Sequence, residues 1–382
     1  MRLESPLKNE LGGQPAVASD PTLRRLGGAF WSRCGSWFTP QEPALPVQAA
    51  EKPEADEPGA GVQSLVDEML NRRRYALLLR RQLIGNLTPE QLERTLESLS
   101  TAMCLVPEGE VTLVLPDSSD EEARLASERN VVFVDACYLD RYPVTNADFR
   151  HFVARGGYEQ MAIWEQEIWP AVLDFVDQTG CPGPRFWQNG RCAPGEDDYP
   201  VVGVCWYEAA AYARWVGKRL ATDGEWVKAA SWPVPLAGHP PLGRRFPWGD
   251  AMDRTRANLC GSGPGHAVPI DQFPGGISVG GVHQLIGNVW EWTADPFTLD
   301  GDPDEIDQAA LATFKSIRGG AFDTYLASQA SCHFRSGERA LARKHNIGFR
   351  TAIGLGDLVL SREPAEFETD EQPETLLAEE ES

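Results

Sequence analysis

Apolar residues recur at helical spacing in two adjacent segments near the start of the patterned part of the chain. The first segment covers residues 64–85 and the second covers residues 88–100. The second begins with Thr88 and Gln91 at the spacing of a capping box, which marks the start of a helix. The pattern therefore predicts a pair of helices within residues 61–103. This pair either binds a partner or packs on the main domain as an accessory, and we favour the accessory role.

The pattern changes at residue 104, where short apolar runs alternate with turn residues. Runs such as "CLVPEGEVTLVLP" and "NVVFVDACYLDRYPV" predict strands, because β-branched and aromatic residues are bounded there by Pro, Gly and Asp. Amphipathic helices are expected over residues 145–156, 205–217 and 222–231. Short strands, few helices and long loops together predict an α+β domain over residues 104–356. Loops of this length in a compact domain usually carry a function or an ion.

Both ends of the chain lack such periodicity. Residues 1–60 are rich in Pro, Gly and Ala, and residues 357–382 are rich in Asp and Glu. Segments of this composition bury too little apolar surface to fold, so we expect both ends to be disordered. The formal net charge of −21 argues against binding to nucleic acid or to an anionic membrane, because both require a basic surface.

Other features of the sequence bear on the compartment. No apolar run reaches the roughly 18 to 20 residues of a membrane span, and the N-terminus shows no secretory signal. The eight cysteines form no CxxC pair, so most are expected to be reduced thiols in a cytoplasmic protein. Cys181 and Cys192 would close a small disulfide loop if the compartment were oxidising.

Several motifs follow one another in a characteristic order. They are "YPVTNADFRHFV", "PVVGVCWYEAAAYARWVGKRLATDGEWVKAA", "FPWGD", "GNVWEWTAD", "RGGAF" and "NIGFR". In this order they resemble the formylglycine-generating enzyme family, also called the sulfatase-modifying-factor family, from about Leu105 to Ile353. The resemblance implies a loop-rich α+β fold that is a variant of the C-type lectin fold, here preceded by a helical N-terminal appendage. It does not fix the activity, because one fold hosts several functions.

The resemblance also implies a structural calcium in the segment "QLIGNVWEW". Its ligands would be the Gln284 side chain, the carbonyls of Gly287 and Val289, and the carboxylate of Glu291, a set of oxygens that suits a hard cation. Gln284 stands where the enzymes usually have Asn. A carboxylate between two tryptophans needs a partner if it is buried. The alternative is that Glu291 accepts backbone hydrogen bonds in a loop without metal.

The catalytic chemistry of the family is less well matched. The oxidase members bind copper(I) through two cysteines that follow the "RGG" motif, whereas only Cys332 is present here. A second branch holds a non-haem iron with three histidines, some of them from an N-terminal helical bundle, and this chain has no His before His151. Copper and iron are therefore not expected, and Cys332 is the remaining catalytic candidate.

The segment between "RGG" and "GFR" is rich in charged and aromatic residues. We expect a ligand-binding surface there, made by Asp323, Tyr325, His333, Arg335, Glu338, Arg339, Lys344 and His345. Alternatively, Arg335, Arg339 and Arg350 are internal salt-bridge partners that fix long loops, and for Arg350 we favour this alternative.

The sequence leaves two functions open. The first is a module of the family that lacks the oxidase cysteine pair and binds a protein or a small polar ligand. The second is a metal-dependent oxidase or oxygenase, of the formylglycine-generating or sulfoxide-synthase type, with a divergent site. We favour the binding module, because the scaffold motifs are intact and the cysteine pair is not.

Overall fold

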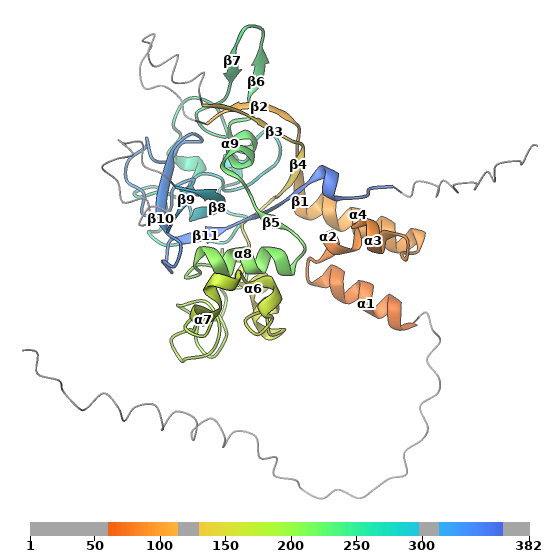
Figure 1. Ribbon diagram of the computed structural model, residues 1–382. Helices are drawn as coiled ribbons and strands as arrows, with labels where there is room; N and C mark the ends of the chain where they lie inside the picture. The colour runs from red at the N-terminus through yellow and green to blue at the C-terminus, as the bar shows by residue number, and fades with distance from the viewer. Residues whose placement is uncertain (1–59, 114–129, 298–312, 362–382) are drawn as a thin grey trace, which may run out of the picture. The chain divides into compact units, whose positions relative to one another are not determined.

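The computed structural model describes residues 60–113, 130–297 and 313–361 (Figure 1). All of them belong to one compact unit, Glu57–Ser382. The N-terminal segment that we expected to be disordered, and most of the acidic tail, lie outside the described residues. No helix in the described part of the chain is long and apolar enough to cross a membrane.

The N-terminal appendage is a set of short helices and not a simple pair. They are α1 (Ala60–Asn71), α2 (Tyr75–Leu78), α3 (Arg81–Ile84) and α4 (Pro89–Ala102). The predicted helix over 64–85 is broken, because Arg73 has a φ of +55°, outside the helical range. The capping box that starts α4 is confirmed, since Thr88 accepts from the Gln91 amide and the Gln91 side chain accepts from the Thr88 amide.

The appendage packs on the main domain. Tyr75, Leu79 and Leu99 belong to one buried cluster with Ile353 from the main domain. The side chain of Arg74 donates a hydrogen bond of 3.0 Å to a main-domain carbonyl. The accessory role that we favoured for these helices is therefore the one that the packing supports.

The described strands of the main domain form two four-stranded sheets and two two-stranded sheets. The first sheet has the order β1 (Met103–Val106), β4 (Cys137–Asp140), β12 (Thr351–Gly354), β5 (Arg219–Leu220). The second has the order β10 (Arg335–Arg339), β9 (Phe314–Arg318), β8 (Trp290–Pro296), β11 (Ile347–Phe349). The pairs are β2 (Gly109–Thr112) with β3 (Val131–Val134), and β6 (Val234–Leu236) with β7 (His239–Leu242). Neighbouring strands are antiparallel except β11 and β8, which are parallel.

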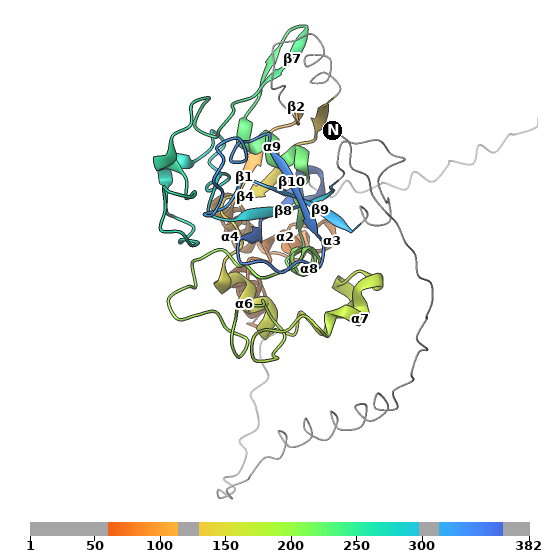
Figure 2. The ribbon, with the colours of Figure 1, turned by 90° about the vertical axis from the view of Figure 1, so that its left-hand side faces the viewer.

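Three described helices of the main domain begin where the sequence predicts: α6 (Asn146–Ala154), α8 (Trp206–Trp215) and α9 (Asp223–Ser231). The short helix α7 (Trp169–Val172) was not predicted. Short 3-10 turns lie at Met161–Ile163, Gln166–Ile168, Arg254–Arg256, Pro274–Gly276 and Leu355–Asp357. Thr145 and Thr222 each cap a helix through a capping box, so these two predictions are confirmed. Figures 1 and 2 show α6 and α8 on one side of the β8–β9 strands and α9 on the other.

The core is divided between these two sides. Rings of Phe149, Phe152, Tyr212 and Phe349 pack edge-to-face or stacked between α6, α8 and β11. On the other side, Trp226 of α9 is fully buried in a second cluster. Aromatic contacts of this kind stabilise a core beyond the area that they bury.

A buried ion pair lies where the two sides meet. Glu291 on β8 and Arg350 after β11 are each 1% exposed, and the guanidinium binds both carboxylate oxygens, at 2.7 and 2.6 Å. Trp226 donates its indole N–H to the same carboxylate at 2.8 Å. Arg350 also donates to the carbonyls of Asp140 and His283. Arg350 is therefore the internal salt-bridge partner that we favoured, and one side chain ties β8, β4 and the loop before β8 together.

Replacing Arg350→Met is expected to lower the free energy of unfolding by about 3 to 5 kcal/mol, because it leaves the Glu291 carboxylate buried without a counter-charge. Urea unfolding followed by tryptophan fluorescence measures this loss. Arg94→Met is the matched control: Arg94 pairs with Asp67 at the surface, and such pairs contribute about 0 to 1 kcal/mol. Equal losses in the two variants would contradict the structural importance of the buried pair.

Candidate functional site

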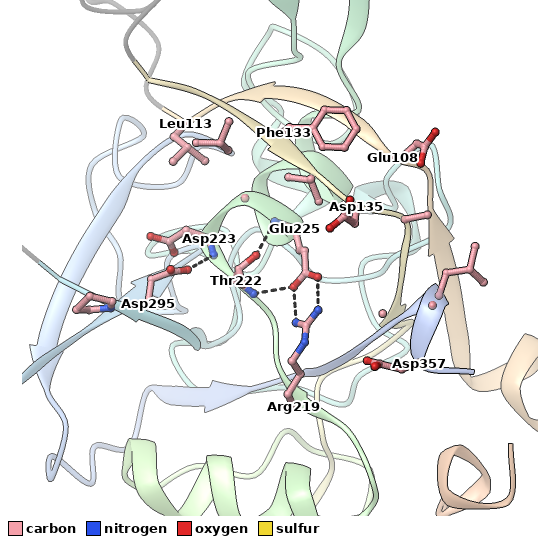
Figure 3. A pocket seen from close by; sticks show the side chains of 18 of the residues that line it. Glu108, Leu113, Phe133, Asp135, Arg219, Thr222, Asp223, Glu225, Asp295 and Asp357 are labelled. Carbon is pink, nitrogen blue, oxygen red and sulfur yellow. Dashed lines mark hydrogen bonds and ion pairs between the residues drawn. The ribbon is translucent and has the colours of Figure 1, made fainter. Parts of the chain in front are cut away.

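A pocket of about 1100 Å³ opens at the start of α9. Its walls come from the β2–β3 pair, the N-terminus of α9, the end of β8 and the turn after β12 (Figure 3). The charged residues that line it are Glu108, Asp135, Arg219, Asp223, Glu225, Asp295, Arg335 and Asp357. Carboxylates outnumber guanidinium groups in this set, so the chemistry of the pocket depends on which carboxylates already have partners.

Both carboxylate oxygens of Glu225 are already hydrogen-bonded within the domain. Its carboxylate accepts two hydrogen bonds from Arg219, at 2.6 and 2.5 Å, and one from the amide of Thr222 (Figure 3). Burial alone would raise the pKa of Glu225, but the hydrogen bonds and charge of Arg219 outweigh it and hold that pKa below its usual range. Glu225 therefore has little capacity left for a ligand.

The carboxylate of Asp223 is also hydrogen-bonded within the domain. The carboxylate is buried and accepts hydrogen bonds of 2.8 Å from Thr293, Ser316 and Arg318. Burial opposes ionisation, yet the Arg318 charge and these donors lower the pKa of Asp223. Arg335 lies 3.6 Å from the same carboxylate and over the ring of Phe297. The buried pair of Asp223 and Arg318 holds the start of α9 against the β8–β9 strands.

Among the buried and half-buried carboxylates of the pocket wall, Asp295 has the fewest hydrogen bonds from described residues. One of its oxygens accepts the backbone N–H of Asp223 at 2.5 Å (Figure 3), and the other accepts no hydrogen bond from any residue that the structure describes. Burial raises the pKa of Asp295, and the nearby Asp223 charge raises it further. A half-buried carboxylate with an uncommitted oxygen is well placed to bind a donor from a ligand.

The remaining groups at the rim add negative charge and an apolar contact. Glu108 and Asp135 are exposed and form no ion pair with a described residue, while Asp357 lies 3.6 Å from Arg80. Phe133 is 64% exposed and lines the same pocket. Carboxylates beside an aromatic face favour a positively charged group with an apolar body.

The residues of the predicted ligand-binding segment lie in different environments. Only Arg335 of that set lines the pocket. Lys344 forms an ion pair with Glu338, and Arg339 lies over the ring of Phe314. These side chains therefore contact one another or the domain itself.

Of the other members, Asp323, Tyr325 and His345 are exposed, and His333 lies in the interior. Asp323 accepts from Asn346 at 2.9 Å and lies 4.0 Å from His345, and Tyr325 is 74% exposed. His333 is buried, and burial together with the Arg318 charge lowers its pKa to about 4. A side chain buried in this way does not contribute to a ligand surface.

Cys332, the catalytic candidate, lies in the core. Its side chain is fully buried, and its backbone amide donates a hydrogen bond of 2.9 Å to the carbonyl of Arg245. Burial raises the pKa of the Cys332 thiol far above its usual range, so the thiol is protonated and a poor copper ligand. A thiol in this position does not fit a copper site made by two thiolates, and it packs as a small apolar side chain instead.

An iron site made by histidines is also a poor fit. Within residues 60–113, 130–297 and 313–361, no group of three or more His, Cys, Asp or Glu side chains is placed to hold a metal ion. His345 is exposed beside the rings of Phe186 and Phe322, whereas His333 is buried. The donors that the structure describes therefore do not fit the iron of the second branch.

Three of the four calcium ligands implied by the resemblance, all but the carbonyl of Val289, have protein partners. The Gln284 side-chain oxygen accepts from Asn288 at 2.7 Å, and the carbonyl of Gly287 accepts from the amide of Val289. Glu291 is bound at both oxygens by Arg350. A guanidinium supplies the positive charge that the cation would otherwise supply, so this set of groups does not fit calcium as it is arranged.

The pocket was not foreseen from the sequence. Asp295 closes the quoted motif "GNVWEWTAD", which is the one local signal that could have pointed to it. Glu108 and Asp135 carry no such signal, because they reach the pocket only through the pairing of β2 with β3.

Comparison with known proteins places the chain in a family. Residues 88–355 match the sulfatase-modifying factor enzyme 1-like domain, and the chain belongs to this family. The resemblance read from the motifs is thereby confirmed, as is the α+β fold of the formylglycine-generating-enzyme type.

Individual relatives differ in activity and in length. The hercynine oxygenase of Mycolicibacterium thermoresistibile is 39% identical over 189 residues, which are 47% of this chain and 41% of that protein. The formylglycine-generating enzyme of Mus musculus is 28% identical over 288 residues, which are 67% of this chain and 74% of that protein. The chain thus spans less than half the length of the hercynine oxygenases that it matches.

Solved structures give more distant matches. PvdO from Pseudomonas aeruginosa matches with a TM-score of 0.43 and 20% identity, over 66% of this chain and 94% of that chain. Treponema denticola variable protein 1 matches with a TM-score of 0.45 and 16% identity, over 65% and 94% of the two chains.

Asp295→Asn is expected to stabilise the protein at neutral pH. The folded state raises the pKa of Asp295, so its ionised form is less favourable in the folded than in the unfolded protein. The stability linked to this group is therefore present at low pH and is lost as pH rises through the raised pKa. In urea unfolding at pH 7, the free energy of unfolding should be higher for Asp295→Asn than for the unchanged protein. The difference between the two should vanish below about pH 4. A variant that is less stable at pH 7 would show that Asp295 is a structural carboxylate.

Proposed function

We propose that this chain is a ligand-binding module of the family and that its pocket binds a positively charged group. The group belongs to a small polar ligand or to a protein. The observation that carries the proposal is Asp295, a half-buried carboxylate in the pocket wall with one oxygen uncommitted to any described residue. Because the other buried carboxylates of the wall are paired with arginine, Asp295 is the group that a cation would find available.

The shape and surroundings of the pocket support the same function. Its volume of about 1100 Å³ exceeds that of a single side chain and is in the range of small-molecule sites. Glu108 and Asp135 add negative charge at the rim, and Phe133 offers an exposed ring. An ammonium or guanidinium group joined to an apolar body would satisfy all three features.

An oxygenase is the second candidate, and the relatives favour it, because they include a hercynine oxygenase and a formylglycine-generating enzyme. Against it stand the protonated, buried thiol of Cys332 and, among the described residues, the poor donor sets for copper and iron. Dioxygen uptake by the purified protein, with copper or iron salts and a thiol substrate, distinguishes the two candidates. Uptake that Cys332→Ser abolishes would favour the oxygenase.

The relation to C-type lectins and the calcium in "QLIGNVWEW" are expectations from the resemblance. The proposed function depends on neither of them. The pocket lies at the start of α9, and its lining does not include Gln284, Gly287, Val289 or Glu291.

Binding is tested with benzylammonium and its neutral counterpart benzyl alcohol, followed by chemical-shift changes in NMR spectra. We expect the cation to bind and the alcohol not to bind at the same concentration. Asp295→Asn should weaken binding of the cation by roughly tenfold or more, which corresponds to about 1.4 kcal/mol. The reason is that the substitution removes the charge and retains the shape.

Asp174→Asn is the control, because Asp174 is exposed and lies outside the pocket. It should leave the affinity for benzylammonium unchanged. Equal binding of cation and alcohol, or equal affinities in the two variants, would contradict a cation site at Asp295.

A further inference from the structure

One strand in the wall of the pocket has an unpaired edge. β3 (Val131–Val134) pairs with β2 alone among the described strands. The amide of Leu113, one residue beyond β2, donates to the carbonyl of Asn130, which marks a hydrogen-bonded pair. Hydrogen-bonded and non-hydrogen-bonded pairs alternate along an antiparallel ladder. The register therefore places the bonds between β3 and β2 at Val132 and Val134.

The other two residues of β3 turn their backbone groups away from β2. Val131 and Phe133 occupy the non-hydrogen-bonded pairs, opposite Thr112 and Glu110. In such pairs the N–H and C=O groups point to the far side of the strand. No described residue forms a hydrogen bond with the backbone of Val131 or of Phe133. The far edge of β3 thus carries N–H and C=O groups that a further strand could pair with.

This unpaired edge borders the pocket. Val132, Phe133 and Val134 line the pocket, whereas no residue within β2 does. Val132 and Val134 point to α9, since a Cβ atom placed on Gly224 would lie 3.3 and 3.0 Å from their side chains. Phe133 points to the opposite face of the strand and is 64% exposed. Because side chains from both faces line one pocket, the pocket lies along the edge of β3 and not over one face.

Two other edge strands are protected against pairing with a further strand, and β3 is not. β10, at the edge of its sheet, reads "RSGER" and carries charges, and β7 contains Pro240 and Pro241. Charges and prolines are the usual means of preventing an added strand. β3 reads "VVFV", and its pairing with β2 has no bulge. Its sequence therefore suits an edge that takes up a strand.

The charges around this edge are negative. Glu110 is exposed on β2, and Glu108 and Asp135 lie at one end of the β2–β3 pair. The two strands contain no Lys or Arg. Asp295, with its uncommitted oxygen, lies on another wall of the same pocket (Figure 3). A strand that pairs with β3 would place its side chains among carboxylates, which favours lysine or arginine.

We propose that the edge of β3 binds an extended segment of a partner protein as an added strand, with a lysine or arginine of that segment at Asp295. Main-chain hydrogen bonds at Val131 and Phe133 hold the segment, and its alternate side chains enter the pocket. The inference rests on the proposed function, because Asp295 receives the positive charge in both. It adds the class of partner, an extended basic segment of a protein.

The test uses the full chain and the peptide acetyl-Lys-Val-Lys-Val-Lys-amide, with amide hydrogen exchange resolved by residue in NMR spectra. Without peptide, the amides of Val131 and Phe133 should exchange faster than those of Val132 and Val134. Saturating peptide should slow exchange at Val131 and Phe133 by roughly tenfold or more and change the other two less. Failure of the peptide to bind, or equal effects on all four amides, would overturn the proposal.

A pair of variants tests the same hydrogen bonds. Val131→Pro removes the outward N–H at the first residue of the strand, where proline is tolerated, and Val131→Ala retains it. The Pro variant should bind the peptide about fivefold more weakly than the Ala variant, the loss expected for one hydrogen bond. Equal affinities of the two folded variants would contradict strand pairing. The exchange measurement uses the unchanged protein, so it decides the matter if Val131→Pro does not fold.

The charge is tested separately with acetyl-Gln-Val-Gln-Val-Gln-amide and with Asp295→Asn. The neutral peptide should bind roughly tenfold or more weakly than the lysine peptide, and Asp295→Asn should remove most of this difference. Benzylammonium binding that depends on Asp295, without protection of Val131 and Phe133 by the peptide, overturns only the added strand. Alternating protection that does not depend on Asp295 overturns only the cation site.

Discussion

The carboxylate of Glu291 is held in the interior by two hydrogen bonds from Arg350 and one from Trp226, and the rest of the domain is arranged around it. A charge in this position is tolerable only with a counter-charge in good geometry. Arg350 meets that need and also binds carbonyls on β4 and on the loop before β8. The same pair therefore joins the two sheets and fixes the strand from which Asp295 emerges.

The chemistry of the pocket follows from which charges are paired and which are not. Asp223 and Glu225 are each bound by an arginine, and they hold the start of α9 in place. Asp295 is a half-buried group beside the start of α9, and no arginine binds it among the described residues. Groups that lower the stability of the fold and have no evident structural role are candidates for function.

Part of the fold could be predicted from the sequence, because some of its features depend only on neighbouring residues. The capping residues Thr88, Thr145 and Thr222 marked helix starts correctly, because a cap acts on the next few residues only. The break at Arg73 was missed, since a positive φ at a residue other than glycine has no reliable local signal. The pocket was also missed, because strand pairing brings its wall together from distant parts of the chain.

Arg350 balances the charge of Glu291 in this structure. The most direct test is the urea unfolding midpoint of the full chain with excess EDTA and with excess calcium. We predict the same midpoint in both conditions, because Arg350 already supplies the counter-charge. A midpoint that falls with EDTA and recovers with calcium would show that a cation binds this loop, and it would contradict the role of the Glu291–Arg350 pair.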